Sequence, residues 1–177
     1  LMRTSDTLPQ QFQAFYELTK DKQWLTIRDN MLSKLEAISA DNKTGLIPDF
    51  IWVEGDKIRA ADADTVESAN DGYYSYNACR LPYNLAQSKD EKSQKMLKKM
   101  LSFFLNQEKI YAGYNLKGKA LNSNQAGSFT APVFYAANNN MEFRKLVQQN
   151  KYLFMQGLPS DNYYDAAVTT MIALETL

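Results

Sequence analysis

Apolar side chains in this sequence recur at the spacing of an α-helix, and this periodicity constrains the fold more than any other feature. Phe12, Phe15, Tyr16 and Thr19 follow the i, i+3, i+4, i+7 pattern of one helix face. A second stripe of the same kind runs through residues 24–38. Residues 8–20 and 22–39 are therefore predicted to form an antiparallel helical pair.

The rest of the chain follows the same helical pattern with interruptions. Further helices are predicted after Asp90, which is a suitable cap, and over residues 73–87, 130–138, 141–155 and 161–176. Pro82 is expected to kink or interrupt the segment 73–87 because it has no donor N–H. No convincing pair of strands is present, so the predicted fold class is all-α, with about seven helices arranged as successive hairpins.

One long segment, residues 51–71, lacks the helical pattern and is predicted to be irregular. It is rich in alanine and carries six acidic side chains: Glu54, Asp56, Asp62, Asp64, Glu67 and Asp71. A loop of this length is unusual in a compact domain unless it is functional or disordered. Its acids are therefore candidate functional groups.

The absence of histidine limits the chemistry that these 177 residues can perform. It excludes Ser-His-Asp and Cys-His arrangements and His-based zinc sites, and it leaves acid–base work to carboxylates, tyrosines or lysines. The single cysteine, Cys79, excludes an internal disulfide and a thiolate metal cluster, and it is interpreted as a small buried apolar residue. No metal and no cofactor is predicted.

Charge and hydropathy exclude further classes of partner. Twenty basic and twenty acidic residues leave no net charge, so no nucleic-acid partner is expected. No apolar run approaches the ~20 residues of a membrane span. The length suits one domain. The first residues show no signal-peptide pattern and enter helical sequence at once, as expected of a chain cut from a larger protein.

Hydrolysis of a glycosidic bond is a reaction that two carboxylates can perform without histidine or metal. One carboxyl group protonates the leaving oxygen and the other activates water. Sugar sites also use aromatic faces, and this chain is 12% aromatic with eleven tyrosines. The alternative is that these tyrosines simply fill the helical core.

Four stretches of the chain resemble glycoside hydrolase family 8, a bacterial group of endoglucanases, lichenases, chitosanases and xylanases. These stretches are SDTLPQQFQAF (5–15), TKDKQW with TGLIPDF (19–24 and 44–50), YSYNACRLPY (74–83), and GSFTAP with NYYDAAVTTMIAL (127–132 and 162–174). They are similar to that family's motifs in the same order. The resemblance covers the C-terminal half of such an enzyme, so residues 1–177 are expected to be the C-terminal portion of an (α/α)6 barrel.

The resemblance also implies roles for particular residues. In the best-known subgroup, an aspartate that acts as general base stands where this chain has Asn77, Arg80 matches the arginine that pairs with it, and Tyr76 supports the attacking water. An asparagine cannot accept the proton. In a subgroup with asparagine at this position, a carboxylate of the preceding loop takes the role, and here Glu67 is favoured, with Asp64 and Asp71 as alternatives. A degenerate, inactive site is the other interpretation.

Substrate contacts are assigned by the same resemblance. Tyr163 and Tyr164 match a tyrosine pair of the family, one expected to line the cleft and one to pack in the core. Trp52, close behind the PDF motif, is a candidate sugar platform with Phe50, although core packing is equally compatible.

The predicted protein is a fragment of a secreted or cell-surface hydrolase of β-1,4-linked polysaccharide, of glucan or chitosan type, that works with inversion. Its general acid, a glutamate, is expected in an N-terminal half that this chain lacks. Its expected partners are the polysaccharide and that N-terminal half of the same barrel. Two alternatives remain open: a catalytically inactive carbohydrate-binding homologue, and an unrelated helical interaction module.

Overall fold

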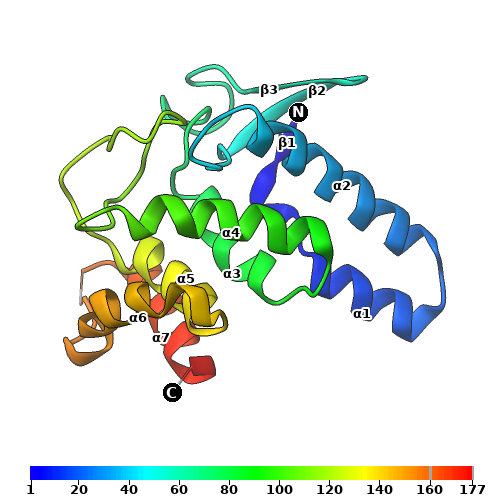
Figure 1. The fold of residues 1–177 in the computed structure, drawn as a ribbon. Coiled ribbons are helices and arrows are strands. Elements are labelled where there is room, and N and C mark those ends of the chain that lie inside the picture. The colour runs from blue at the N-terminus through cyan, green and yellow to red at the C-terminus, as the bar shows by residue number, and fades with distance from the viewer. Residues whose placement is uncertain (160, 177) are drawn as a thin grey trace.

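The computed structural model describes residues 1–159 and 161–176, and α-helices dominate it (Figure 1). The helices are α1 (Pro9–Thr19), α2 (Gln23–Ala40), α3 (Leu81–Ala86), α4 (Glu91–Leu105), α5 (Gly127–Asn138), α6 (Arg144–Asn150) and α7 (Tyr163–Thr176). Short 3-10 helices are η1 (Thr4–Asp6), η2 (Ala78–Arg80), η3 (Met141–Phe143) and η4 (Lys151–Met155). The predicted helical content is confirmed, although the predicted helix over 141–155 is split into η3, α6 and η4.

Helices α1 and α2 form the predicted antiparallel hairpin, on the right in Figure 1. Lys20, in a left-handed conformation with φ of 60°, ends α1, and its N–H donates to the Tyr16 carbonyl. Phe15 packs on Trp24 across the hairpin with ring centroids 4.9 Å apart. Leu18 on α1 nevertheless remains 83% exposed, so part of the apolar face of this hairpin is uncovered by the residues that the structure describes.

The expectation that the chain has no strand pairs is wrong. β1 (Met2–Arg3), β2 (Phe50–Glu54) and β3 (Lys57–Ala60) form a three-stranded antiparallel sheet in the order β1-β2-β3. A two-residue turn joins β2 to β3, and Gly55 in this turn has a φ of 61° that glycine adopts without strain. These strands have only two to five residues, too few for a period-2 pattern to stand out.

The segment 73–87 is helical only in its second half, which corrects the prediction. Residues up to Asn77 form a turn, and η2 and α3 follow. Pro82 lies in the first turn of α3, where its missing N–H has no intrahelical partner to lose, so it neither kinks nor interrupts the helix.

An aromatic cluster forms the centre of the core. Tyr74, Phe104, Tyr114 and Phe129 are fully buried and come from four separate segments. Tyr74 also exchanges two main-chain hydrogen bonds with Tyr114, so the residues just before Asn77 are anchored at the core.

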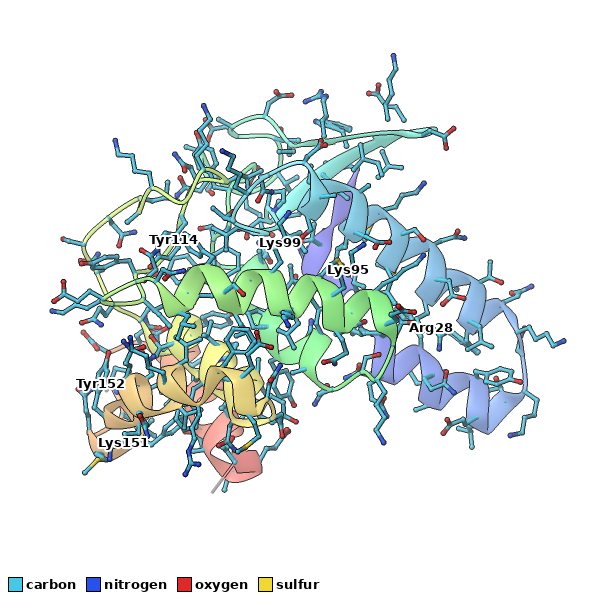
Figure 2. The ribbon with its side chains drawn as sticks, viewed as in Figure 1. Arg28, Lys95, Lys99, Tyr114, Lys151 and Tyr152 are labelled. Carbon is cyan, nitrogen blue, oxygen red and sulfur yellow. The ribbon has the colours of Figure 1, made fainter. Side chains whose placement is uncertain are left out.

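Helix α4 crosses the middle of the molecule and connects its two sides (Figure 1). Asp90 caps it as predicted, accepting hydrogen bonds from the N–H groups of Lys92 and Ser93. Lys95 and Lys99, labelled in Figure 2, reach α2, where their Nζ atoms bond to Glu36 Oε1 at 2.9 Å and the Ser39 carbonyl at 2.6 Å. Helices α3, α5 and α7 pack together on the other side of α4.

Candidate active site

A tight turn before η2 presents Asn77 and is held by a buried aspartate far away in the sequence. Asp49 Oδ1 accepts hydrogen bonds from the N–H groups of Ser75 at 3.0 Å and Ala78 at 2.7 Å. Asp49 is 3% exposed and directly precedes β2. In a regular helix the Ala78 N–H would bond to the Tyr74 carbonyl, but here it bonds to Asp49 and the Tyr74 carbonyl accepts from the Tyr114 N–H, so a turn forms instead.

Asn77 is the centre of a chain of hydrogen bonds between side chains. Its Nδ2 donates to Glu67 Oε2 at 2.8 Å, and its Oδ1 accepts from an Arg80 Nη2 at 2.9 Å. The same Arg80 nitrogen donates to Ser5 Oγ at 2.8 Å, and Arg80 Nε donates to the Asn77 carbonyl at 3.3 Å. Because Arg80 can only donate, it fixes the amide orientation in which Nδ2 faces Glu67.

Glu67 is held from two sides. Arg3 on β1 donates to its Oε1 at 2.6 Å, opposite the bond from Asn77. Arg3 in turn lies over the ring of Phe50, 5.4 Å from the ring centroid. The Glu67 side chain is still 45% exposed, so its oxygens remain open to solvent.

The two alternative loop acids are placed differently. The Asp71 side chain accepts hydrogen bonds from the N–H groups of Val66, Glu67 and Ser68, and Asp71 is only 1% exposed. Asp71 therefore shapes the turn that carries Glu67. Asp64 is exposed and has a φ of 55°. Only Glu67 of the three bonds to Asn77.

Tyr76 and Tyr164 lie beside this network. Tyr76 is 48% exposed, and its ring packs edge-on against Phe129 with centroids 5.0 Å apart. Tyr164 donates from its hydroxyl to the Tyr76 carbonyl at 3.1 Å. Partial burial raises the pKa of Tyr76, and nearby Asp165 and Cys79 add to this effect, so its hydroxyl stays protonated at neutral pH.

Two other predicted contact residues are not joined to the network. Tyr163 is 88% exposed at the start of α7. Trp52 lies on β2 with the Arg59 guanidinium 5.8 Å from its ring centroid. Their contacts with sugar stay predictions.

Cys79 is fully buried, as interpreted from the sequence. Burial raises the pKa of its thiol to about 12, so it is protonated and shielded at neutral pH. Within residues 1–159 and 161–176, no group of three or more acidic or cysteine side chains is arranged to hold a metal ion.

Sequence reasoning missed two members of the site, Arg3 and Asp49. Asp49 stands in the quoted TGLIPDF motif, and that motif was a usable signal. Arg3 carries no local signal, because only the pairing of β1 with β2 brings it beside Phe50.

Comparison with protein families identifies the chain. The model of glycosyl hydrolases family 8 matches residues 4–176. The chain belongs to this family. Family 8 membership sets aside the unrelated helical interaction module.

Two curated family 8 relatives are similar over most of the chain. A β-glucanase of Niallia circulans is 32% identical over 146 residues, which are 76% of this chain and 36% of that protein. An endoglucanase of Bacillus sp. (strain KSM-330) is 28% identical over 156 residues, 82% of this chain and 34% of that protein. The chain thus spans about a third of the length of these relatives.

Solved structures of similar proteins agree with the fold. The apo β-1,3-1,4-glucanase of Paenibacillus sp. X4 superposes with a TM-score of 0.89 at 26% identity, covering 99% of this chain and 49% of that one. A family 8 enzyme of Teredinibacter turnerae, solved with xylobiose, superposes with a TM-score of 0.77 at 21% identity, covering 98% of this chain and 45% of that one. The prediction of about half an (α/α)6 barrel is confirmed. In the part of the chain that the structure describes, no helix is both long and apolar enough to cross a bilayer.

Proposed function

We propose that residues 1–177 are the C-terminal portion of a glycosidase domain that cleaves a β-1,4-linked polysaccharide with inversion, and that Glu67 is its general base. The observation that carries this proposal is the bond between Glu67 and Asn77, the residue at the position of the family's aspartate base. A carboxylate beside this position supplies the basicity that the amide lacks.

The network gives each member a role in the reaction. Glu67 takes a proton from the attacking water as that water bonds to the anomeric carbon, while the glycosidic C–O bond breaks and the general acid protonates the leaving oxygen. Asn77 and Arg3 hold the two oxygens of Glu67 in place, and Arg80 holds Asn77. Inversion requires the acid and the base to be about 6.5–9.5 Å apart, so that water fits between the base and the sugar. We place the general acid, a glutamate, in the other half of the barrel.

Exposed apolar side chains support such a missing half. Phe15 and Leu18 on α1 and Met171 and Leu174 on α7 are 44%, 83%, 41% and 82% exposed, respectively. Large apolar groups exposed on several helices mark a surface that another unit covers. The N-terminal half of the same barrel is the proposed partner.

A β-glucan is the favoured substrate, because the relatives are named β-glucanase and endoglucanase. This leaves a chitosan-type glycan as the second candidate. A polymeric glycan does not cross membranes, so we also place the protein outside the cytoplasm, secreted or on the cell surface.

The test compares Glu67→Gln with Asp64→Asn in a protein that contains both halves of the barrel. Turnover of mixed-linkage β-glucan by Glu67→Gln is expected to fall about 10²- to 10⁴-fold, with an unchanged KM. Asp64→Asn is the matched control, since it changes an exposed acid of the same loop, and it should keep parental activity. Azide is already an anion and needs no base, so it should restore part of the Glu67→Gln rate.

The outcomes separate the candidate functions. Parental activity in Glu67→Gln would refute Glu67 as the base. A parent protein that binds β-glucan without releasing reducing sugar would favour the inactive carbohydrate-binding homologue. Asn77 makes this a specific alternative, because its amide cannot accept a proton. Proton NMR of the first products should show the α-anomer, and the β-anomer would refute inversion.

A further inference from the structure

We propose that Asp49 is a positioning residue for this site: its buried carboxylate holds the turn from Ser75 to Ala78 so that the Asn77 amide faces Glu67. The catalytic consequence rests on the proposed function, whereas the structural part does not depend on activity. Asp49 is only 3% exposed and its Oδ1 already accepts two main-chain N–H bonds, so it is not itself a candidate base.

The contacts of Asp49 surround Asn77 on the chain. Its Oδ1 bonds to the N–H of Ser75, two residues before Asn77, and to the N–H of Ala78, one residue after it. The main-chain N–H and side-chain amide of Asn77 face the same carboxylate and stabilise its charged form. One carboxylate therefore holds the main chain on both sides of Asn77.

Main-chain bonds make this anchor rigid. The N–H of Asp49 donates to the Tyr73 carbonyl at 2.8 Å, and its carbonyl accepts from the N–H of Thr4 at 3.0 Å. Asp49 thus ties the turn to the segment that carries Arg3 and Ser5, which hold the far ends of the Glu67 and Arg80 side chains. One residue connects both sides of the network.

Two opposing effects place the pKa of Asp49 close to physiological pH. Burial raises the pKa of Asp49 from 3.8 to about 6, and the N–H donors of Ala78, Asn77 and Ser75 limit this rise. The other ionisable groups that face it are Glu67 and Arg80 through Asn77, and Tyr74, Cys79 and Tyr164 from the core.

The neighbours of Asp49 in the core keep their charge state in the pH range where Asp49 changes its own. Tyr74, Cys79 and Tyr164 stay protonated, because burial raises the pKa of each. When Asp49 gains a proton, its Oδ1 becomes a weaker acceptor for the N–H groups of the turn, and the hold on Asn77 loosens.

The experiment follows the side-chain amide signal of Asn77 by ¹H–¹⁵N NMR between pH 4.5 and 8. It uses the Glu67→Gln protein with both barrel halves, because this substitution removes the carboxylate that bonds directly to the Asn77 amide. The Asn77 signal is expected to shift with a midpoint near pH 6, the pKa of Asp49. Adding Asp49→Asn should abolish this transition.

Asp90→Asn is the matched control. Asp90 also accepts two main-chain N–H bonds, at the start of α4, and should leave the Asn77 transition unchanged. On the active parent background, Asp49→Asn is expected to lower kcat about 10- to 100-fold with KM unchanged, as for a small displacement of a reacting group.

Each outcome decides the proposal. No Asn77 transition near pH 6 in the Glu67→Gln protein overturns it even if the Asp49→Asn variant does not fold. A transition that persists in the double variant also overturns it. If Asp49→Asn removes the NMR transition while the parent protein releases no sugar, the positioning role stands and the proposed function fails.

Discussion

Replacing Arg80 with lysine tests whether Asn77 must be held to serve the base. Lysine keeps the positive charge but ends about one C–N bond, ~1.3 Å, short of the Arg80 Nη2 that bonds to Asn77 Oδ1 at 2.9 Å and Ser5 Oγ at 2.8 Å. Both contacts would lengthen beyond hydrogen-bonding distance without movement of the main chain. The bond from Nε to the Asn77 carbonyl has no equivalent in lysine.

The magnitude follows from the bond that orients the amide. A hydrogen bond to a charged group contributes about 1.5–3 kcal/mol, and each ~1.4 kcal/mol is a tenfold change in rate. If that bond keeps Asn77 directed at Glu67, Arg80→Lys should lower kcat about 10- to 140-fold. KM should change little, since Arg80 acts through Asn77 and not on the sugar.

The assay is the initial rate of sugar release from mixed-linkage β-glucan by the protein with both halves, with the melting temperature measured in parallel. Arg28→Lys is the matched control, because Arg28 lies on the α1–α2 hairpin and bonds to Gln13 and Asp29 (Figure 2). The same substitution is then made in an Asn77→Ala background, where it should cost almost nothing. A full loss in that background, or parental kcat in Arg80→Lys itself, would refute the reasoning.

Two further predictions concern the rest of the chain. Burial raises the pKa of the Cys79 thiol to about 12, so Cys79 should resist iodoacetamide at pH 8 in the native protein and react after unfolding. Mass spectrometry follows the labelling, and rapid labelling of the folded protein would contradict the burial of Cys79. The isolated 177-residue chain should hydrolyse no glucan. It should self-associate in sedimentation experiments through the exposed Leu18 and Leu174. The double variant Leu18→Glu, Leu174→Glu should shift the chain toward monomer. A monomer at all concentrations would argue against a missing half.

The parts of the fold that could be predicted are those set by local signals. The stripe on α1 and α2 and the cap at Asp90 depend on residues within a few positions of one another. The aromatic content of segment 73–77 suits a helix face and predicts a helix, whereas the structure has a turn there. The N–H groups of Ser75 and Ala78 are taken by Asp49, 26 and 29 residues away, which no local pattern shows.

The residues of the site also differ in whether the sequence indicates them. The acidic loop and the family resemblance together point to Glu67, and the structure does bring it to Asn77. Arg3 could not be predicted, since its contact depends on the pairing of β1 with β2. The family resemblance points to Trp52 and Tyr163 as sugar contacts, and no hydrogen bond in the described residues joins them to the network.

Three acidic side chains near Asn77 have different surroundings. These surroundings indicate which of them stabilise a turn and which one is free to contact a water molecule. Asp49 and Asp71 are buried and accept main-chain N–H bonds, so their charge is committed to shaping two turns. Glu67 bonds only to side chains through its carboxylate and stays open to solvent.

An aspartate in place of Asn77 would bring a third carboxylate against Asp49 and Glu67, and like charges at this distance oppose one another. Asparagine instead donates its Nδ2–H to Glu67 Oε2 at 2.8 Å, and its N–H groups stabilise the charged form of Asp49. The amide at position 77 and the carboxylate at position 67 therefore depend on each other. This pairing favours a working base over a decayed site, because loss of the aspartate alone would not require an acid held by both Arg3 and Asn77.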